Sequence, residues 1–298
     1  MLKQRIITAL VLLPIALGGF FLLDGAAFSL FIGLVVSLGA WEWARLAGYN
    51  EQSARIGYAA VVAGLMLVLA WLPQLAGAVL VLALLWWALA IVMVLTYPDS
   101  ASSWGGRWRR LLIGLLILLP AWQGLVLLKQ WPLSNWLIVA VMVLVWAADI
   151  GAYFSGKAFG KRKLAPRVSP GKSWEGFFGG MALCLVITVV VAIYRDWTVR
   201  ELLLALPCAA IVVALSVIGD LTESMFKRQS GLKDSSNLLP GHGGVLDRID
   251  SLTAAIPVFT ALLWAVGWVL RESSSVDHRA GGDGLDRSQH PRRHRTSS

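Results

Sequence analysis

Residues 56–98, IGYAAVVAGLMLVLAWLPQLAGAVLVLALLWWALAIVMVLTYP, decide the fold because they contain no Asp, Glu, Lys or Arg. A transmembrane helix needs about 20 consecutive apolar residues, so this stretch is long enough for two crossings. Within a bilayer every backbone polar group must be paired, and an uninterrupted apolar run of this length favours helices. The sequence therefore predicts an integral membrane protein built from α-helices.

Other uncharged stretches predict the rest of the helices. They lie at 6–23, 25–41, 111–128, 130–148, 176–194, 202–219 and 251–270. Together with two helices in 56–98, they predict an all-α, polytopic fold with about nine transmembrane helices. We expect residues 1–270 to form the membrane-embedded domain. Residues 271–298 are rich in Ser, Gly, Asp and Arg, which is typical of a disordered tail.

The composition excludes several classes of protein. Of the 298 residues, 57% are hydrophobic and 14% charged, which excludes a disordered chain and disfavours a water-soluble domain. The net charge of +9 is typical of basic loops that face anionic lipid. No basic run is interleaved with aromatic residues, so we expect no nucleic-acid partner. Cys184 and Cys208 lie inside apolar segments, where two buried thiols are expected instead of a disulfide.

The basic residues predict an orientation in the membrane. Loops on the N-terminal side of the predicted helices carry 17 Lys and Arg, whereas the opposite loops carry three, Lys129, Arg195 and Arg200. Because basic loops stay in the cytoplasm, we expect the N-terminus and the two long polar loops, 149–176 and 220–250, to lie there.

Acidic residues are concentrated in the second of these loops. Of the 13 Asp and Glu before the tail, five lie between positions 220 and 250: Asp220, Glu223, Asp234, Asp247 and Asp250. One acid at the end of a helix would be an ordinary interfacial residue. Five acids mixed with four basic residues at the edge of the membrane instead indicate a functional site, because ionisable groups there are costly.

The spacing indicates what this site binds. If the helix continues past Asp220, then Asp220, Ser224 and Lys227 share one face of it, and Asp247 and Asp250 share a face of the next helix. Carboxylates at two helix ends suit Mg²⁺, which completes its coordination with water and phosphate oxygens. The glycines of residues 241–244, GHGG, let backbone amides approach an anion. Together these features predict a metal–polyphosphate site, in which His242 is an acid–base group, a phosphate donor or a structural loop residue.

The first polar loop, DIGAYFSGKAFGKRKLAPRVSPGKSWEG at 149–176, contains six basic and two acidic residues. A cytoplasmic loop would explain its charge alone. Its recurring glycines, together with Ser169 and Ser173, suggest a folded loop that contacts phosphate. Asp149 follows an apolar run, so we expect it to be embedded and paired with Lys157 or Lys172.

Two segments resemble a known family. Residues 224–250, with SMFKR, KD and LPGHGGVLDRID in order, resemble the signature of the phosphatidate cytidylyltransferases, or CDP-diacylglycerol synthases. Residues 169–176, SPGKSWEG, are similar to a second conserved stretch of that family. The resemblance implies an enzyme that condenses CTP with phosphatidic acid, giving CDP-diacylglycerol and pyrophosphate.

The resemblance also implies cofactors, partners and site residues. It implies Mg²⁺ or another divalent cation, with room for a second metal ion, and a homodimer in the inner (plasma) membrane whose site faces the cytoplasm. Asp220 and Asp247 match the metal-ligand positions of the family. The predicted catalytic residues are Asp220, Lys233, Asp234, His242, Asp247 and Asp250. The predicted substrate-binding residues are Lys157, Ser169, Lys172, Ser224, Lys227, Arg228, Gly243, Gly244 and Arg248.

Other functions fit parts of the pattern. An ion-coupled transporter would also carry acids in the membrane, although no pair of similar halves with broken helices is evident. A non-catalytic lipid-binding scaffold would explain the basic residues but not the concentration of acids. A related nucleotidyl or phosphoryl transferase that acts on another lipid is the nearest alternative.

Overall fold

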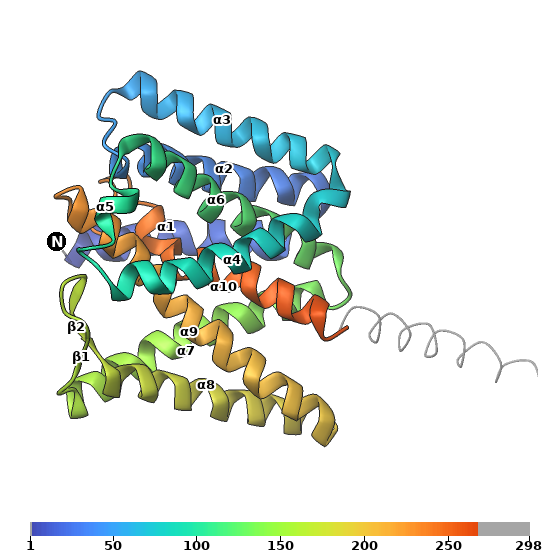
Figure 1. Ribbon diagram of the computed structural model, residues 1–298. Helices are drawn as coiled ribbons and strands as arrows, with labels where there is room; N and C mark the ends of the chain where they lie inside the picture. The colour runs from blue at the N-terminus through green and yellow to red at the C-terminus, as the bar shows by residue number, and fades with distance from the viewer. Residues whose placement is uncertain (1, 268–298) are drawn as a thin grey trace, which may run out of the picture.

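The computed structural model describes residues 2–267, which are almost entirely helical (Figure 1). The helices are α1 (Leu2–Phe21), α2 (Gly25–Leu46), α3 (Gln52–Trp71), α4 (Ala76–Leu95), α5 (Ala101–Trp104), α6 (Arg107–Gln130), α7 (Ser134–Phe159), α8 (Trp174–Tyr194), α9 (Val199–Gln229) and α10 (Leu246–Ala265). A 3-10 turn, Pro73–Leu75, precedes α4. Strands β1 (Lys163–Ala165) and β2 (Ser169–Ser173) form an antiparallel hairpin between α7 and α8.

The prediction of an all-α polytopic protein is confirmed. Within residues 2–267, nine helices are long and apolar enough to cross a membrane, and the short α5 is the exception. Large apolar side chains cover their outer surfaces, as at Leu10, Leu85 and Ile193, which are 67%, 65% and 72% exposed. Such a surface is stable in lipid but not in water. Cys184 and Cys208 are both free thiols, as predicted. The predicted tail, 271–298, lies outside the described residues.

Several helices extend beyond the uncharged stretches that predicted them. The helix predicted at 202–219 continues to Gln229, and the one predicted at 130–148 continues to Phe159. Charged residues are tolerated in these extensions because the backbone N–H and C=O groups of a helix are hydrogen-bonded to each other, whether lipid or water surrounds the helix. The prediction of a loop from 149 to 176 is therefore wrong for its first part, because Asp149 and Lys157 lie in α7. The β-hairpin forms the remainder.

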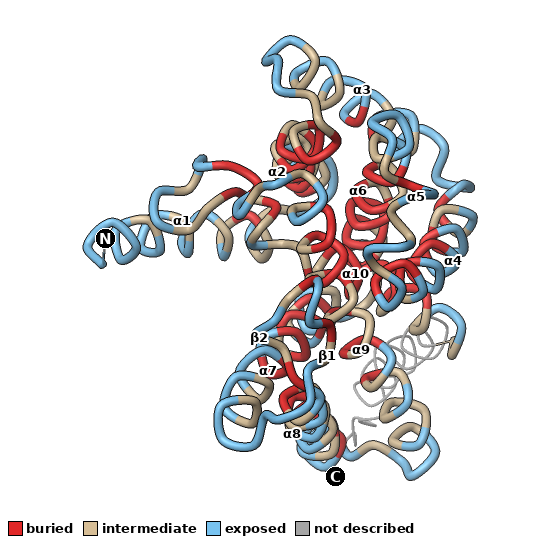
Figure 2. The backbone as a smooth tube through the Cα atoms, turned by 60° about the vertical axis from the view of Figure 1, so that its left-hand side comes forward, coloured by how far each residue is buried: buried red, intermediate tan, exposed pale blue. Residues whose placement is uncertain are grey.

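The bundle has a central helix, α10, and two groups of helices beside it. In Figure 1, α2, α3 and α6 lie on one side of α10, while α7, α8 and α9 lie on the other. Figure 2 shows the buried residues concentrated around α6 and α10, whereas α1 lies apart over most of its length. The only buried residue of α1 is Gly19.

Small residues allow two pairs of helices to approach closely. A Cβ atom at Gly151 of α7 would lie 2.9 Å from the Cα atom of Gly180 in α8. A Cβ atom at Gly219 of α9 would lie 2.7 Å from the carbonyl oxygen of Asp250 in α10. Small residues at such crossings are typical of membrane helices, whose association depends on close packing. The second crossing brings the acidic end of α9 beside the first turns of α10.

Candidate active site

The cytoplasmic loop predicted at 220–250 is, in the structure, two helix ends joined by a compact turn. Helix α9 carries Asp220, Glu223 and Lys227 in its last turns, and α10 begins at Leu246, directly before Asp247. The absence of a side chain at Gly219 lets this end of α9 approach the backbone of α10 at Asp250. The predicted convergence of acids from two helices is thus present in the structure.

Asp247 is the most extensively hydrogen-bonded acid of the site. Its Oδ2 atom accepts hydrogen bonds from the Gly244 amide at 2.7 Å, the Ser235 hydroxyl at 2.8 Å and the Ser235 amide at 3.0 Å. Its Oδ1 atom accepts a hydrogen bond from Lys227 Nζ at 2.8 Å. Only 6% of the side chain is exposed. Asp247 therefore organises the turn that precedes α10, besides contributing charge.

Lys227 joins the two helices through its ammonium group. Besides the bond to Asp247, it forms an ion pair with Glu223 Oε1 at 3.3 Å. The Glu223 side chain is 4% exposed, and no described residue donates a hydrogen bond to its carboxylate. A buried carboxylate without a cation beside it is strongly destabilising, so Lys227 is needed for both acids.

Asp220 is paired with a lysine from a distant part of the chain. The ammonium group of Lys172, on β2, donates a short hydrogen bond to Asp220 Oδ2, and Ser224 Oγ donates to Oδ1 at 3.3 Å. The side chains of Asp220 and Lys172 are each 27% exposed. The partners of Asp220 are all side chains, which can move, whereas Asp247 is held partly by the backbone.

A cavity of about 390 Å³ opens beside the Lys172 side chain. It lies between α7, α8 and the hairpin, and its wall includes Asp149, Tyr153, Lys157, Lys172 and Phe177. Lys172 is close enough to stabilise a negative charge on Asp149, but the ion pair of Lys172 is with Asp220. The expected ion pair of Asp149 with Lys157 or Lys172 is therefore absent among the described residues.

Asp250 lies on α10, where its backbone approaches Gly219 of α9. Its Oδ1 atom accepts a hydrogen bond from the Ser251 amide at 2.7 Å. The carboxyl group also interacts electrostatically with Asp220, Lys172 and Lys227. Asp250 is therefore within electrostatic range of both lysines, although no ion pair joins it to either of them among the described residues.

The glycine turn has a specific backbone geometry. The Leu239 amide donates to the Gly243 carbonyl at 2.8 Å, and the His242 amide donates to the Leu239 carbonyl at 2.8 Å. Gly241 and Gly243 have φ values of +78° and +80°, a region that favours glycine. The Gly244 amide, predicted to contact substrate, is bound to Asp247 in this structure.

The remaining predicted residues surround this core. Arg228 Nε donates to the Val168 carbonyl of the hairpin at 3.2 Å, and Arg248 Nε donates to the His242 carbonyl at 2.9 Å. Lys233 and Asp234 are exposed in the loop after α9, and Ser169 is half-buried at the start of β2. His242 Nδ1 is buried, and no described residue forms a hydrogen bond with it.

Sequence reasoning missed one residue, Glu42 of α2, which is completely buried. Its carboxylate accepts hydrogen bonds from the Leu246 amide at 2.6 Å, the Val245 amide at 2.9 Å and the Ser236 hydroxyl at 2.5 Å. It therefore caps the N-terminus of α10, where a negative charge is favourable. Its position directly after the uncharged stretch 25–41 is the one feature of the sequence that could have indicated a functional or structural role for Glu42.

The site contains oxygen ligands of the kind that hard cations prefer, but lysines neutralise them in this structure. Among the described residues, no group of three or more His, Cys, Asp and Glu side chains has the arrangement of a metal site. The ammonium groups of Lys172 and Lys227 instead lie against Asp220 and Asp247. A lysine ammonium group thus lies beside each of the two predicted metal ligands.

Comparison with known proteins shows extensive similarity. Residues 3–266 match a family model described as the cytidylyltransferase family. A phosphatidate cytidylyltransferase of Pseudomonas aeruginosa is 79% identical over 268 residues, which are 90% of this chain and 99% of that protein. A protein of the same name from Haemophilus influenzae is 43% identical, over 87% of this chain and 98% of its own length. Another from Brucella suis is 39% identical, over 91% of this chain and 95% of its own length.

Proposed function

Because the chain belongs to the cytidylyltransferase family, we propose that Asp220, Asp247 and Asp250 form the centre of its active site. The activity itself is the transfer of a cytidylyl group from CTP to phosphatidic acid, which gives CDP-diacylglycerol and pyrophosphate for phospholipid biosynthesis. The observation that carries the assignment is two ion pairs that bring β2, α9 and α10 together, Lys172 with Asp220 and Lys227 with Asp247; Lys172 also lines the cavity.

The charge of the reactants explains the basic side chains. A lipid phosphate and a triphosphate repel each other, so positive groups must neutralise them before they can react. Lys172 and Lys227 lie in the site already, held by carboxylates that fix the position of each ammonium group. We assign them to the phosphates, with Lys157, Arg228, Lys233 and Arg248 as further cationic groups at the rim.

Bond formation requires no nucleophilic side chain. A phosphatidic acid oxygen attacks the α-phosphorus of CTP, a new P–O bond forms, and the bond to the β-phosphate oxygen breaks with release of pyrophosphate. The attacking oxygen is an anion at neutral pH, so the protein contributes mainly alignment and charge stabilisation. Asp234 and His242 lie on the loop after α9, where we assign them to positioning of the reactants.

The cavity beside Lys172 suits the lipid substrate. Tyr153, Phe177 and Leu164 provide apolar walls, while Lys157 and Lys172 provide positive charge. This combination matches a molecule with an apolar body and a phosphate. We therefore place phosphatidic acid in this cavity, with its phosphate towards Lys172. Ser169, at the start of β2, stays a predicted substrate contact.

A divalent cation is part of the proposal. Asp220 and Asp247 would hold Mg²⁺ or a similar ion, and Asp250 lies where a second ion would gain a ligand. When bound, such an ion neutralises phosphate oxygens and favours the loss of pyrophosphate. Asp220 fits this role because its partners are side chains that can turn away. At Asp247 the Oδ1 atom fits it, because its only side-chain partner is Lys227, whereas Oδ2 is held by the Gly244 and Ser235 amides.

The location and assembly are also proposals. The 17 basic residues on one side against three on the other support an inner-membrane protein whose site faces the cytoplasm. Accessibility of single cysteines introduced at exposed Lys233 and at Trp71 would test this orientation in sealed vesicles. The homodimer rests on the family resemblance, and cross-linking in the membrane would test it.

An assay of pyrophosphate release tests the proposed site and its substrate. The purified chain is supplied with CTP, dCTP or ATP, together with phosphatidic acid, another lipid phosphate or no lipid, in Mg²⁺ and in excess chelator. We expect release from CTP only when phosphatidic acid and Mg²⁺ are both present. Equal release with another lipid phosphate would contradict the assignment of the lipid, and full activity in chelator would contradict the assignment of the metal.

A further inference from the structure

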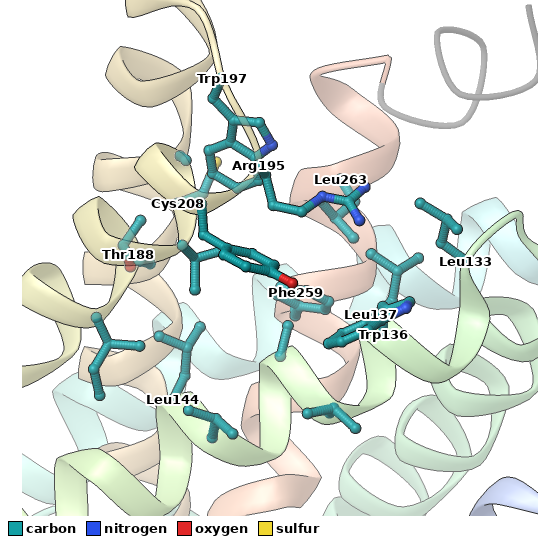
Figure 3. Close-up of a pocket in the computed structure, with 18 residues that line it drawn as sticks. Leu133, Trp136, Leu137, Leu144, Thr188, Arg195, Trp197, Cys208, Phe259 and Leu263 are labelled. Carbon is teal, nitrogen blue, oxygen red and sulfur yellow. The ribbon is translucent and has the colours of Figure 1, made fainter. Parts of the chain in front are cut away.

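A second pocket lies between α7, α8, α9 and α10, and the proposed reaction does not use it (Figure 3). Its volume is about 280 Å³. Leu137, Leu144, Ile187, Ala205, Phe259 and Leu263 are among the residues that line it. Its wall is almost entirely hydrocarbon, so a ligand that occupies its interior must be apolar.

The pocket and the acidic site lie at opposite ends of the bundle. The pocket is formed by the start of α7 and α9 and by the end of α8 and α10, whereas the acids lie at the end of α9 and the start of α10. Since these four helices are long enough to cross the membrane, the pocket faces the leaflet opposite the active site.

Arg195 lies at the mouth of this pocket. Figure 3 shows its side chain extending across the opening towards Leu263, with Trp197 and Trp136 also at the rim. Among the residues that the structure describes, no ion pair or side-chain hydrogen bond engages the Arg195 guanidinium. By contrast Lys129, another basic residue of this side, pairs with Asp24 at 3.4 Å. Arg195 therefore has its positive charge available for a ligand.

We propose that this pocket binds an acyl chain of a membrane glycerophospholipid, whose phosphate pairs with Arg195. Guanidinium groups bind phosphate in a bidentate manner, and tryptophans favour the headgroup level, where Trp136 and Trp197 lie. The volume exceeds the roughly 150 Å³ of a protein cavity that takes up benzene, so a segment of an acyl chain fits. A helix of a second copy of the chain is about 10 Å across and is too wide to fit in the pocket.

The bound lipid would fill the space between four helices. An acyl chain in the pocket would make dispersion contacts with wall atoms of all four helices. The site would thus link the α8–α9 turn to α7 and α10, far from the reacting groups. The inference does not depend on the assignment of the active site.

Photo-labelling of the full chain in nanodiscs tests the proposal. Two probes carry the same acyl chain with a diazirine at its end, one as phosphatidylglycerol and one as diacylglycerol, which lacks the phosphate. Labelled peptides are identified by mass spectrometry. In the unmodified chain we expect phosphatidylglycerol to label the first half of α7 and residues 205–209, severalfold more than diacylglycerol does.

Two matched pairs of variants distinguish the phosphate from the acyl chain. Arg195→Gln should reduce labelling by phosphatidylglycerol to the level of diacylglycerol, whereas Arg200→Gln, on the same side but outside the pocket, should not. Ala205→Phe should reduce labelling by both probes severalfold, whereas Ala210→Phe, which does not line the pocket, should not. Equal labelling by both probes, or labelling unaffected by Arg195→Gln, would overturn the proposal. Loss of a dimer in Ala205→Phe with unchanged labelling would assign the pocket to a second copy instead.

Discussion

Lys227 Nζ lies 2.8 Å from Asp247 Oδ1 and 3.3 Å from Glu223 Oε1, so one ammonium group neutralises acids of two helices. Glu223 and Lys227 are one turn apart on α9, but Asp247 lies on α10, after a loop of 16 residues. The contact of Lys227 with Glu223 is therefore set by the geometry of one helix, whereas its contact with Asp247 depends on how α9 and α10 pack. Lys227, which we assign to phosphate binding, is therefore also needed for the stability of the fold.

Replacement of Lys227 by Met should destabilise the protein. The change leaves two buried carboxylates without their cation, which costs about 3–5 kcal/mol when one partner of a buried pair is removed. We expect a clear fall in the apparent melting temperature in detergent, together with loss of CDP-diacylglycerol synthesis. Lys233→Met, at an exposed position, is the control and should melt like the unmodified chain. Equal melting temperatures for the two variants would contradict the role of Lys227.

Replacement of Asp220 and Asp247 by Asn should separate activity from stability. Both variants should lose at least about 10²-fold in kcat if the carboxylates stabilise charge in the reaction. Asp220→Asn should retain most of its thermal stability, because its partners are the side chains of Lys172 and Ser224. Asp247→Asn should also lose stability, because its amide keeps one acceptor oxygen, so either Lys227 or the Gly244 and Ser235 donors lose their acceptor.

The measurement for this pair is pyrophosphate release over a Mg²⁺ titration, combined with thermal unfolding. Asp24→Asn is the control, since Asp24 is 82% exposed and pairs with Lys129 at the other end of the bundle. If Asp220→Asn turned over at the rate of Asp24→Asn, the assignment of Asp220 to the site would be wrong.

Glu42→Ala should weaken the N-terminus of α10. It removes the acceptor of two backbone amides, those of Val245 and Leu246, and each buried amide left without a partner costs about 1–3 kcal/mol. Because Asp247 follows Leu246 directly, we expect kcat to fall while KM for CTP changes less. Glu42→Gln, which keeps one acceptor oxygen, should recover part of the loss.

The control for Glu42 is Glu51→Ala, because Glu51 is exposed before α3 and makes no capping bond with its side chain. Differential scanning fluorimetry and initial rates would be compared for the three variants. The positioning role would be excluded if Glu42→Ala melted and reacted like Glu51→Ala.

Gly219→Ala should separate the two acidic helices. The new methyl group would lie 2.7 Å from the Asp250 carbonyl oxygen and 3.0 Å from the Ala254 Cβ atom, so α9 and α10 must move apart. We expect lower stability and a large loss of activity. Gly64→Ala, where nothing lies within 4 Å, should be neutral or stabilising by up to about 1 kcal/mol. Crystal or cryo-electron microscopy density for Gly219→Ala would show the displacement directly.

The helices themselves could be predicted because their determinants are local. Uncharged runs such as 56–98 must pair their own backbone groups in lipid, whatever surrounds them. The prediction failed where charge was taken as the end of a helix, as at Asp149, since charged side chains beyond the hydrocarbon do not interrupt helical hydrogen bonds. At Asp220 the helix continues, as the shared face of Asp220, Ser224 and Lys227 required.

By itself the sequence determined that apolar helices form, nine of them within residues 2–267, and that acids, glycines and lysines gather where one helix ends and the next begins. Only the tertiary structure decided that Lys172 pairs with Asp220, that Lys227 pairs with Asp247, and that Glu42 caps α10. These partners lie between 20 and 204 positions apart in the chain. Their contacts depend on how each helix is rotated and packed against its neighbours, which no local pattern of residues specifies.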